Sequence, residues 1–127
     1  MTVTVMLVDD SKLARIVAGK TLAALQPDWE RVEASNADEA LQLVGERQID
    51  VAILDFNMPG KDGLELAAEL REAYPQMPIA VITANIQDEI IARARSVNAT
   101  FVSKPVTEEG LQGFLSGAAL RLRHAKS

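Results

Sequence analysis

The sequence contains no cysteine and only one histidine in 127 residues. Without cysteine the chain can form neither a disulfide framework nor a thiolate zinc site, and it has no cysteine nucleophile. The single histidine, His124, lies close to the end of the given sequence, and we expect it to be chemically inert. Metal binding or catalysis by this chain is therefore expected to depend on oxygen ligands and on lysine.

Long hydrophobic runs and an excess of positive charge are also missing. No apolar run approaches the roughly 18 residues that a transmembrane helix requires. The first residues lead directly into an apolar strand, without the basic segment and cleavage site of a signal peptide, so we expect a cytoplasmic protein. The net charge of −5 and the pI of about 4.8 argue against direct nucleic-acid binding.

The composition is that of a single globular domain. Hydrophobic residues make up 48% of the chain, which is enough for a substantial core, and 127 residues is a common domain size. We expect one domain over residues 1–122, followed by a short polar tail at residues 123–127.

Strand and helix patterns alternate five times along the chain. The expected strands are short, apolar and mostly β-branched, and they cover residues 3–8, 31–34, 51–55, 78–83 and 99–103. The expected helices lie between Ser11 and Pro27 and at residues 36–47, 64–73, 87–97 and 107–122. Such alternation predicts a parallel sheet with right-handed connections and helices on both faces.

Three of the expected helices show apolar residues at helical spacing. In the first helix they are Leu13, Ile16, Val17, Thr21, Ala24 and Leu25. In the fourth they are Ile86, Ile90, Ala94 and Val97, and in the fifth Leu111, Phe114, Leu115, Ala118 and Leu122, which we expect to face inward.

Polar residues follow four of the expected strands. Asp9-Asp10 come after the first strand, Asp55 and Asn57 after the third, Thr83 after the fourth and Lys104 after the fifth. In an open parallel sheet, ligands bind outside the carboxyl ends of the strands. Three carboxylates, a hydroxyl and an ammonium should therefore meet in one crevice, which would suit a hard cation and a phosphoryl group.

Four motifs together resemble the receiver domain of two-component response regulators. They are VDDS at residues 8–11, LDFNMPGKDG at 54–63, ITA at 82–84 and FVSKP at 101–105. Each alone is a weak signal, but their order and spacing fit the family over the whole chain. The resemblance implies a flavodoxin-like (CheY-like), doubly wound α/β fold with a five-stranded parallel sheet in the order 2-1-3-4-5 and five helices.

The resemblance also implies a metal-dependent phosphorylation site. Asp55 would be the phosphoacceptor, since carboxylates can form acyl-phosphate intermediates. Asp9, Asp10 and Asp55, with the backbone carbonyl of Asn57, would bind Mg²⁺, or alternatively Mn²⁺, because such ions prefer oxygen ligands. The protein would be a phosphoacceptor switch, and it would catalyse only its own phosphorylation and dephosphorylation.

Further residues would contact the phosphoryl group. By resemblance, Lys104 would pair with one oxygen, the Thr83 hydroxyl would donate to another, and the backbone N–H groups of Ala84 and Phe56 would be additional donors. A cis peptide is expected at Lys104-Pro105, aiming the lysine at the site. Thr83 and Phe101 would act as the switch residues.

The same resemblance indicates the partners. The phosphodonor would be a sensor histidine kinase or a histidine phosphotransfer protein, and signalling to an unknown protein would use the fourth helix, fifth strand and fifth helix. The chain would be a stand-alone regulator, monomeric or dimerising on phosphorylation. Alternatives are a receiver cut from a larger regulator with a DNA-binding or enzymatic output domain, and a phosphate sink.

Other classes of protein fit less well. Phosphohydrolases that form an aspartyl phosphate generally carry a second aspartate two residues after the nucleophile, where this chain has Asn57. A dinucleotide-binding domain needs a glycine-rich turn after the first strand, where this chain has Asp9-Asp10. A flavodoxin-like binding module that never meets phosphate would not need the full set of acids, Thr83 and Lys104.

Overall fold

The computed structural model describes residues 3–84 and 87–125. Strands and helices alternate over this range: β1 Thr4–Val8, α1 Lys12–Leu25, β2 Glu30–Ala34, α2 Ala37–Glu46, β3 Val51–Asp55, α3 Gly63–Ala73, β4 Ile79–Thr83, α4 Asp88–Ser96, β5 Thr100–Ser103 and α5 Glu108–Ala125. All neighbouring strands are parallel, in the order β2-β1-β3-β4-β5. The predicted fold and strand order are confirmed.

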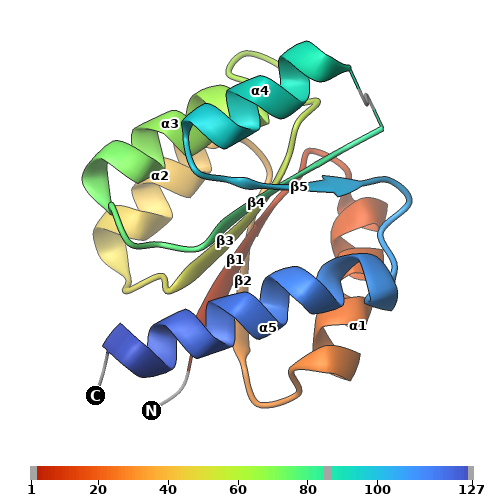
Figure 1. Ribbon diagram of the computed structural model, residues 1–127, viewed down its shortest axis with the longest axis vertical. Coiled ribbons are helices and arrows are strands. Elements are labelled where there is room, and N and C mark those ends of the chain that lie inside the picture. Colours follow the sequence, from red (N-terminus) through yellow and green to blue (C-terminus); the bar gives the residue numbers. More distant parts are fainter. Residues whose placement is uncertain (1–2, 85–86, 126–127) are drawn as a thin grey trace.

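The helices cover both faces of the sheet. Figure 1 shows α2, α3 and α4 on one face and α1 and α5 on the other. Because successive strand residues point to opposite faces, Val5 of β1 belongs to the apolar cluster under α1 and α5, whereas Met6 belongs to the cluster under α2, α3 and α4. The three central strands are buried on both faces, so their sequences are continuously apolar.

Side-chain caps set the beginnings of four helices, one of them α5, where the Thr107 hydroxyl accepts the Gly110 N–H at 3.0 Å. The Ser11 hydroxyl accepts the N–H of Ala14 at 3.2 Å, as expected for an N-cap of α1. Asn36 caps α2 in the same way. Asp62 caps α3 in a capping box with Glu65. At the other end of the chain α5 continues to Ala125, so the expected polar tail is helical in its first three residues.

Helix α1 turns the expected apolar positions outward. Leu13, Ile16 and Val17 are 70%, 43% and 47% exposed. The residues of α1 that are buried against the sheet are Ala18, Gly19 and Leu22. Small residues let the helix approach the strands closely, and the larger apolar side chains are left on the surface. In α4 and α5 the expected inward residues Ile90, Ala94, Leu111 and Leu115 are buried, while Ile86 lies outside the described residues.

Arg71 ties the end of α4 to α3. Its guanidinium, on α3, donates hydrogen bonds to the carbonyls of Val97 and Asn98 at 2.9 Å each. It also donates to carbonyls in the connection from α3 to β4, those of Pro75 at 3.0 Å and Met77 at 2.6 Å. A guanidinium has five N–H donors in a rigid fork, so one side chain fixes the positions of two connections at the amino-terminal edge of the sheet.

Gly63 lies where the chain leaves the loop after β3 and enters α3. A Cβ atom added at this glycine would lie 2.4 Å from the carbonyl oxygen of Asp55 and 2.9 Å from the Cα of Phe56. The N–H of Gly63 also donates to the Phe56 carbonyl at 3.0 Å. The atoms in the way belong to the backbone, which cannot move aside cheaply. Glycine is therefore needed here for close packing against Asp55.

We expect Gly63→Ala to lower the free energy of unfolding by about 1–3 kcal/mol, the range seen when a packed site is overfilled. Gly113→Ala is the matched control, because a Cβ at that position in α5 would meet open space. That substitution should stabilise the protein by about 0.5–1 kcal/mol. Urea unfolding followed by circular dichroism measures both changes, and a Gly63→Ala variant as stable as wild type would contradict the steric argument.

Candidate functional site

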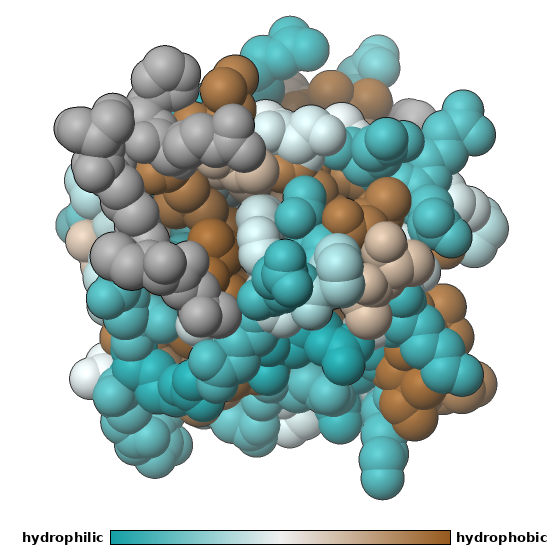
Figure 2. All heavy atoms as spheres, turned by 90° about the horizontal axis from the view of Figure 1, so that it is seen from below, coloured by the Kyte–Doolittle hydropathy of each residue, from teal (hydrophilic) through white to brown (hydrophobic). Residues whose placement is uncertain are grey.

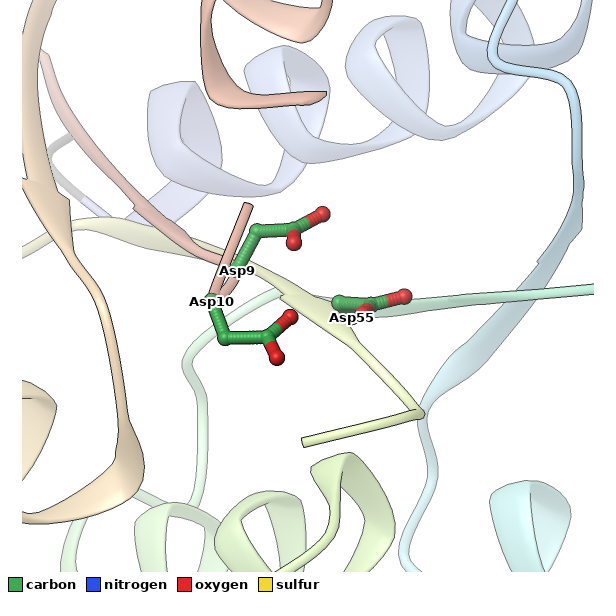
Figure 3. A group of neighbouring side chains, drawn as sticks. All are labelled: Asp9, Asp10 and Asp55. Carbon is green, nitrogen blue, oxygen red and sulfur yellow. The ribbon is translucent and has the colours of Figure 1, made fainter. Parts of the chain in front are cut away.

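Three carboxylates gather at the carboxyl edge of the sheet. Asp9 and Asp10 directly follow β1, and Asp55 ends the neighbouring strand β3. One oxygen from each carboxylate lies within 4.8 Å of the other two, and Figure 3 shows the three side chains converging beside the ends of these strands. Asp55 is only 4% exposed, whereas Asp10 is exposed, so the group opens to solvent on the Asp10 side.

The charges of this group oppose one another. Burial raises the pKa of Asp9 above its ordinary value of 3.8, and the carboxylates of Asp55 and Asp10 raise it further. A hydrogen bond from the Ser11 N–H, at 2.9 Å, and the nearby Lys104 ammonium partly offset this rise in the pKa of Asp9. The net result is a raised pKa, so ionised Asp9 is less favourable here than in water, first because it is buried and then because of the neighbouring carboxylates.

Lys104 supplies one positive charge from the end of β5. Its Nζ lies 2.8 Å from Oδ1 of Asp55. The backbone of Lys104 is also tied to the end of the neighbouring strand β4, because the Lys104 N–H donates to the Thr83 carbonyl at 3.0 Å. The peptide bond of Lys104-Pro105 is cis, as the resemblance implies.

The environment of Asp55 leaves room for a further ligand. The contact with Lys104 has the distance of an ion pair but not the direction of a hydrogen bond, and Oδ1 is buried without a hydrogen-bond partner among the described residues. A buried carboxylate oxygen in that state is costly unless something else coordinates it. Three converging carboxylates and an unsatisfied oxygen suit a divalent cation, which prefers oxygen ligands.

The other predicted residues lie at the same edge of the sheet. Thr83 is the last residue of β4 and is fully buried, and Ala84, which follows it, is exposed. Asn57 is exposed in the loop after β3, two residues beyond Asp55. Phe101 of β5 is half-buried and packs against the cluster under α2, α3 and α4.

The N–H group of Phe56 is already occupied. It donates to the Ile82 carbonyl at 2.9 Å, as part of the pairing between β3 and β4. Donation from this N–H to a phosphoryl oxygen stays a prediction, and it would require the bond to Ile82 to be given up or shared.

Arg15 is a residue of the site that the sequence analysis missed. From α1, its Nη1 donates to the backbone carbonyl of Asp9 and its Nε pairs with Glu33 of β2 at 2.8 Å. The side chain thereby holds the junction between β1 and α1 that carries the first two acids. No spacing rule identifies such a contact, since it joins a helix to the backbone behind it and to an edge strand.

The enclosed space at the site is small. A cavity of about 10 Å³ lies beside Asp9, Arg15 and Asp55, which is room for about one water-sized group. A cavity of about 340 Å³ lies elsewhere, lined by residues of the connection from α3 to β4 and by the last turns of α5, and includes none of the three acids. The acidic site therefore fits an ion or a group that reaches it from solvent, rather than an enclosed organic substrate.

The family model described as "Response regulator receiver domain" matches residues 5–115. The chain belongs to the response regulator receiver family. Receiver domains are phosphoacceptor switches, and the acidic group found here is the divalent-metal type of site that they carry. No helix in the described part of this receiver is both long and apolar enough to cross a membrane.

Curated relatives of this receiver are longer regulatory proteins. It is 40% identical over 119 residues to the "Positive alginate biosynthesis regulatory protein" of Pseudomonas aeruginosa, covering 91% of this chain and 46% of that protein. It is 31% identical to the "Transcriptional regulatory protein MalR" of Bacillus subtilis, covering 90% of this chain and 49% of that protein. The receiver thus spans about half the length of these relatives.

A solved structure that is matched over nearly its whole chain is also similar. The chemotaxis protein CheY4 of Vibrio cholerae superposes with a TM-score of 0.83 at 30% identity, and the match covers 93% of this receiver and 99% of that chain. Similarity over the whole of CheY4 shows that this fold also occurs as a chain of receiver size.

Asp9→Asn should stabilise the metal-free protein at neutral pH. Asparagine keeps an oxygen that can accept the Ser11 N–H but removes one charge from the carboxylate group. Because the pKa of Asp9 is raised in the folded state, ionised Asp9 disfavours folding above that pKa. The gain in unfolding free energy should shrink as pH falls through the raised pKa and vanish well below 3.8, where Asp9 is protonated in both states.

Urea unfolding at a series of pH values, in the presence of a chelator, tests this expectation. Magnesium should narrow the difference between wild type and variant, because the cation removes the repulsion. A gain that persists unchanged into acid, or no gain at neutral pH, would show that ionised Asp9 does not destabilise the fold.

Proposed function

We propose that this receiver accepts a phosphoryl group on Asp55 in a magnesium-dependent reaction and passes the change to a partner through the face made by α4, β5 and α5. The observation that carries the proposal is the surroundings of Asp55: a buried carboxylate with two further carboxylates within 4.8 Å and a lysine ammonium at 2.8 Å. Negative charge from Asp9 and Asp10 would suit a cation, and Lys104 would suit an added phosphoryl oxygen.

The carboxylates of Asp9, Asp10 and Asp55 would hold the metal ion, together with the backbone carbonyl of Asn57. Magnesium fits this set because it takes a few carboxylates and completes its shell with water and phosphate oxygens, and manganese is an alternative. When bound, the ion supplies positive charge that offsets the carboxylates and the incoming phosphoryl oxygens.

Asp55 would be the nucleophile. One of its carboxylate oxygens forms a bond to phosphorus while the bond from phosphorus to the donor's imidazole nitrogen breaks, and that nitrogen keeps the electron pair. The charge on the transferring group spreads over its three equatorial oxygens, so catalysis rests on positioning and electrostatics. Lys104, the Thr83 hydroxyl and the N–H groups of Ala84 and Phe56 would stabilise those oxygens.

The donor would be a sensor histidine kinase or a histidine phosphotransfer protein that docks on α1. This helix starts two residues after Asp10 and exposes Leu13, Ile16 and Val17, an unusual concentration of apolar surface beside the acidic site. Figure 2 views the molecule from below Figure 1, the side of α5 and the end of α1, where apolar groups lie between polar ones. A protein donor must reach Asp55, and an apolar surface at this place would hold it there.

The output would depend on Thr83 and Phe101. Phosphorylation adds about −1.5 to −2 charges, and a shift of Thr83 toward the phosphoryl group would free space for the half-buried Phe101 ring to turn inward.

We infer a stand-alone regulator with its domain at residues 1–122, monomeric or dimerising when phosphorylated. The similarity to CheY4 over 99% of that chain supports this, whereas the 46% coverage of the alginate regulator favours the alternative of a receiver joined to an output domain.

Wild-type protein incubated with acetyl phosphate should gain the mass of one phosphoryl group only when magnesium is present, and hydroxylamine should remove it. Asp55→Asn should abolish the gain, while Asp28→Asn, a change at an exposed loop aspartate, should leave it intact. Intact-protein mass spectrometry gives the result. Labelling of Asp55→Asn at the wild-type level would overturn the assignment of the phosphoacceptor.

Lys104→Ala should still accept the phosphoryl group but should transmit the change poorly, because the ammonium that joins the end of β5 to Asp55 is lost. Amide chemical shifts of α4, β5 and α5, recorded with and without acetyl phosphate and magnesium, measure how far the change at Asp55 reaches this face. Shift changes across this face as large as those of wild type would remove Lys104 from the proposed switch.

A further inference from the structure

Arg93 of α4 contacts both ends of the loop that follows Asp55. This loop, residues 56–62, starts at Phe56 and ends at Asp62, the N-cap of α3. The Arg93 guanidinium carbon lies 6.0 Å from the centroid of the Phe56 ring, a cation–π distance. Its Nη2 lies 3.5 Å from Oδ2 of Asp62. One side chain from a different helix thus closes the loop at its first and last residues.

The conformation of this loop matters because the loop carries a proposed metal ligand. It contains Asn57, whose carbonyl is the proposed fourth metal ligand, and it leaves the sheet directly from the phosphoacceptor. The loop is also held by the Gly63 N–H bonded to the Phe56 carbonyl, by the capping box of Asp62 with Glu65, by the buried side chain of Met58 and by the ion pair of Lys61 with Glu69. Asn57 itself is exposed, so its carbonyl is positioned by the residues around it, and the Arg93 contacts contribute at the two ends of the loop.

The two contacts use separate parts of each loop residue. Asp62 accepts the Glu65 N–H through Oδ1 at 2.8 Å and faces Arg93 with Oδ2, so capping and ion pairing do not compete. Phe56 uses its backbone in the pairing with β4 and its ring under Arg93. Arg93 can therefore be removed without removing the cap of α3 or the strand pairing.

We propose that Arg93 is a positioning residue for the metal site, which holds the loop of residues 56–62 in the conformation that binds magnesium and links that conformation to the position of α4. The inference rests on the proposed function of Asp55 and its neighbours. Because the link is thermodynamic, anything that displaces α4 from the loop would weaken metal binding, and metal binding would favour the docked α4 to the same degree.

The positive charge of Arg93 and its role in positioning the loop predict opposite effects on magnesium affinity when the residue is removed. A guanidinium near an acidic site disfavours a cation, so removing it should strengthen magnesium binding if charge alone mattered. If Arg93 positions the loop, removing it should weaken magnesium binding. Arg95 is the matched control, because it lies on the same last turn of α4, is exposed and carries the same charge.

The experiment is a magnesium titration of wild type, Arg93→Ala, Arg93→Lys and Arg95→Ala, followed by amide chemical shifts. We expect Arg93→Ala to weaken magnesium binding by about threefold to tenfold, the range that one partly exposed cation–π contact and one partly exposed ion pair together allow. Arg93→Lys should recover part of the loss, and Arg95→Ala should bind magnesium as wild type or slightly more tightly. Asp62→Asn, which keeps the cap, should reproduce part of the loss.

The results separate this inference from the proposed function. Wild type that binds no magnesium would overturn the metal site itself, and with it the ground for the inference. Wild type that binds magnesium, with Arg93→Ala equal to Arg95→Ala or tighter than wild type, would overturn the role of Arg93 alone. Unfolding curves of each variant confirm that the weakened binding occurs in folded protein.

Discussion

Repulsion among three carboxylates held at one edge of a sheet is the constraint on which this molecule is organised. The carboxyl ends of β1 and β3 bring Asp9, Asp10 and Asp55 within 4.8 Å of one another, with Asp55 buried and Asp10 open to solvent. Within the described chain, Lys104 offsets part of this charge at Asp55. The remaining negative charge is not compensated by any described residue, and such a group suits a cation.

The loop after β3 is in contact with several different elements of the fold. Gly63 packs against the Asp55 carbonyl, Asp62 begins α3, and Arg93 reaches over from α4. One turn further along, just past the end of α4, the carbonyls of Val97 and Asn98 accept short hydrogen bonds from Arg71. The carboxyl end of α4 is thus held firmly by these neutral acceptors and more weakly through Arg93, whose contacts are a long ion pair and a ring. Movement of this helix would be expected to pivot near Val97.

The positions of strands and helices and the composition of the acidic site could be predicted because each depends on local patterns, whereas the strand order was implied by the resemblance to the receiver family. Buried parallel strands are continuously apolar, and the residue after each strand end necessarily lies at the same edge of the sheet. The exposed face of α1 could not be predicted from spacing, because Leu13, Ile16 and Val17 are more apolar than the small residues Ala18 and Gly19 that actually pack on the strands. Periodicity identifies an apolar stripe on a helix, but it does not show whether that stripe packs on the sheet or faces solvent.

The contacts of arginine were the other part that the sequence did not reveal. Arg15, Arg71 and Arg93 each join elements that are distant in the sequence, and their partners are backbone carbonyls, a ring or a capping acid. A long side chain with five donors can reach many acceptors, so its choice depends on the relative placement of helices. That placement is decided by packing over the whole sheet and is not encoded in any local motif.

The acidic edge also affects how quickly different phosphodonors can arrive. A small donor such as acetyl phosphate is an anion, and it approaches a chain with net charge −5 toward an edge that carries three aspartates. Added salt screens that repulsion and should speed the encounter. A protein donor whose contact surface is basic would experience the reverse, since the same field attracts it and salt weakens the attraction. Ionic strength would then select between metabolite and protein as the source of the phosphoryl group.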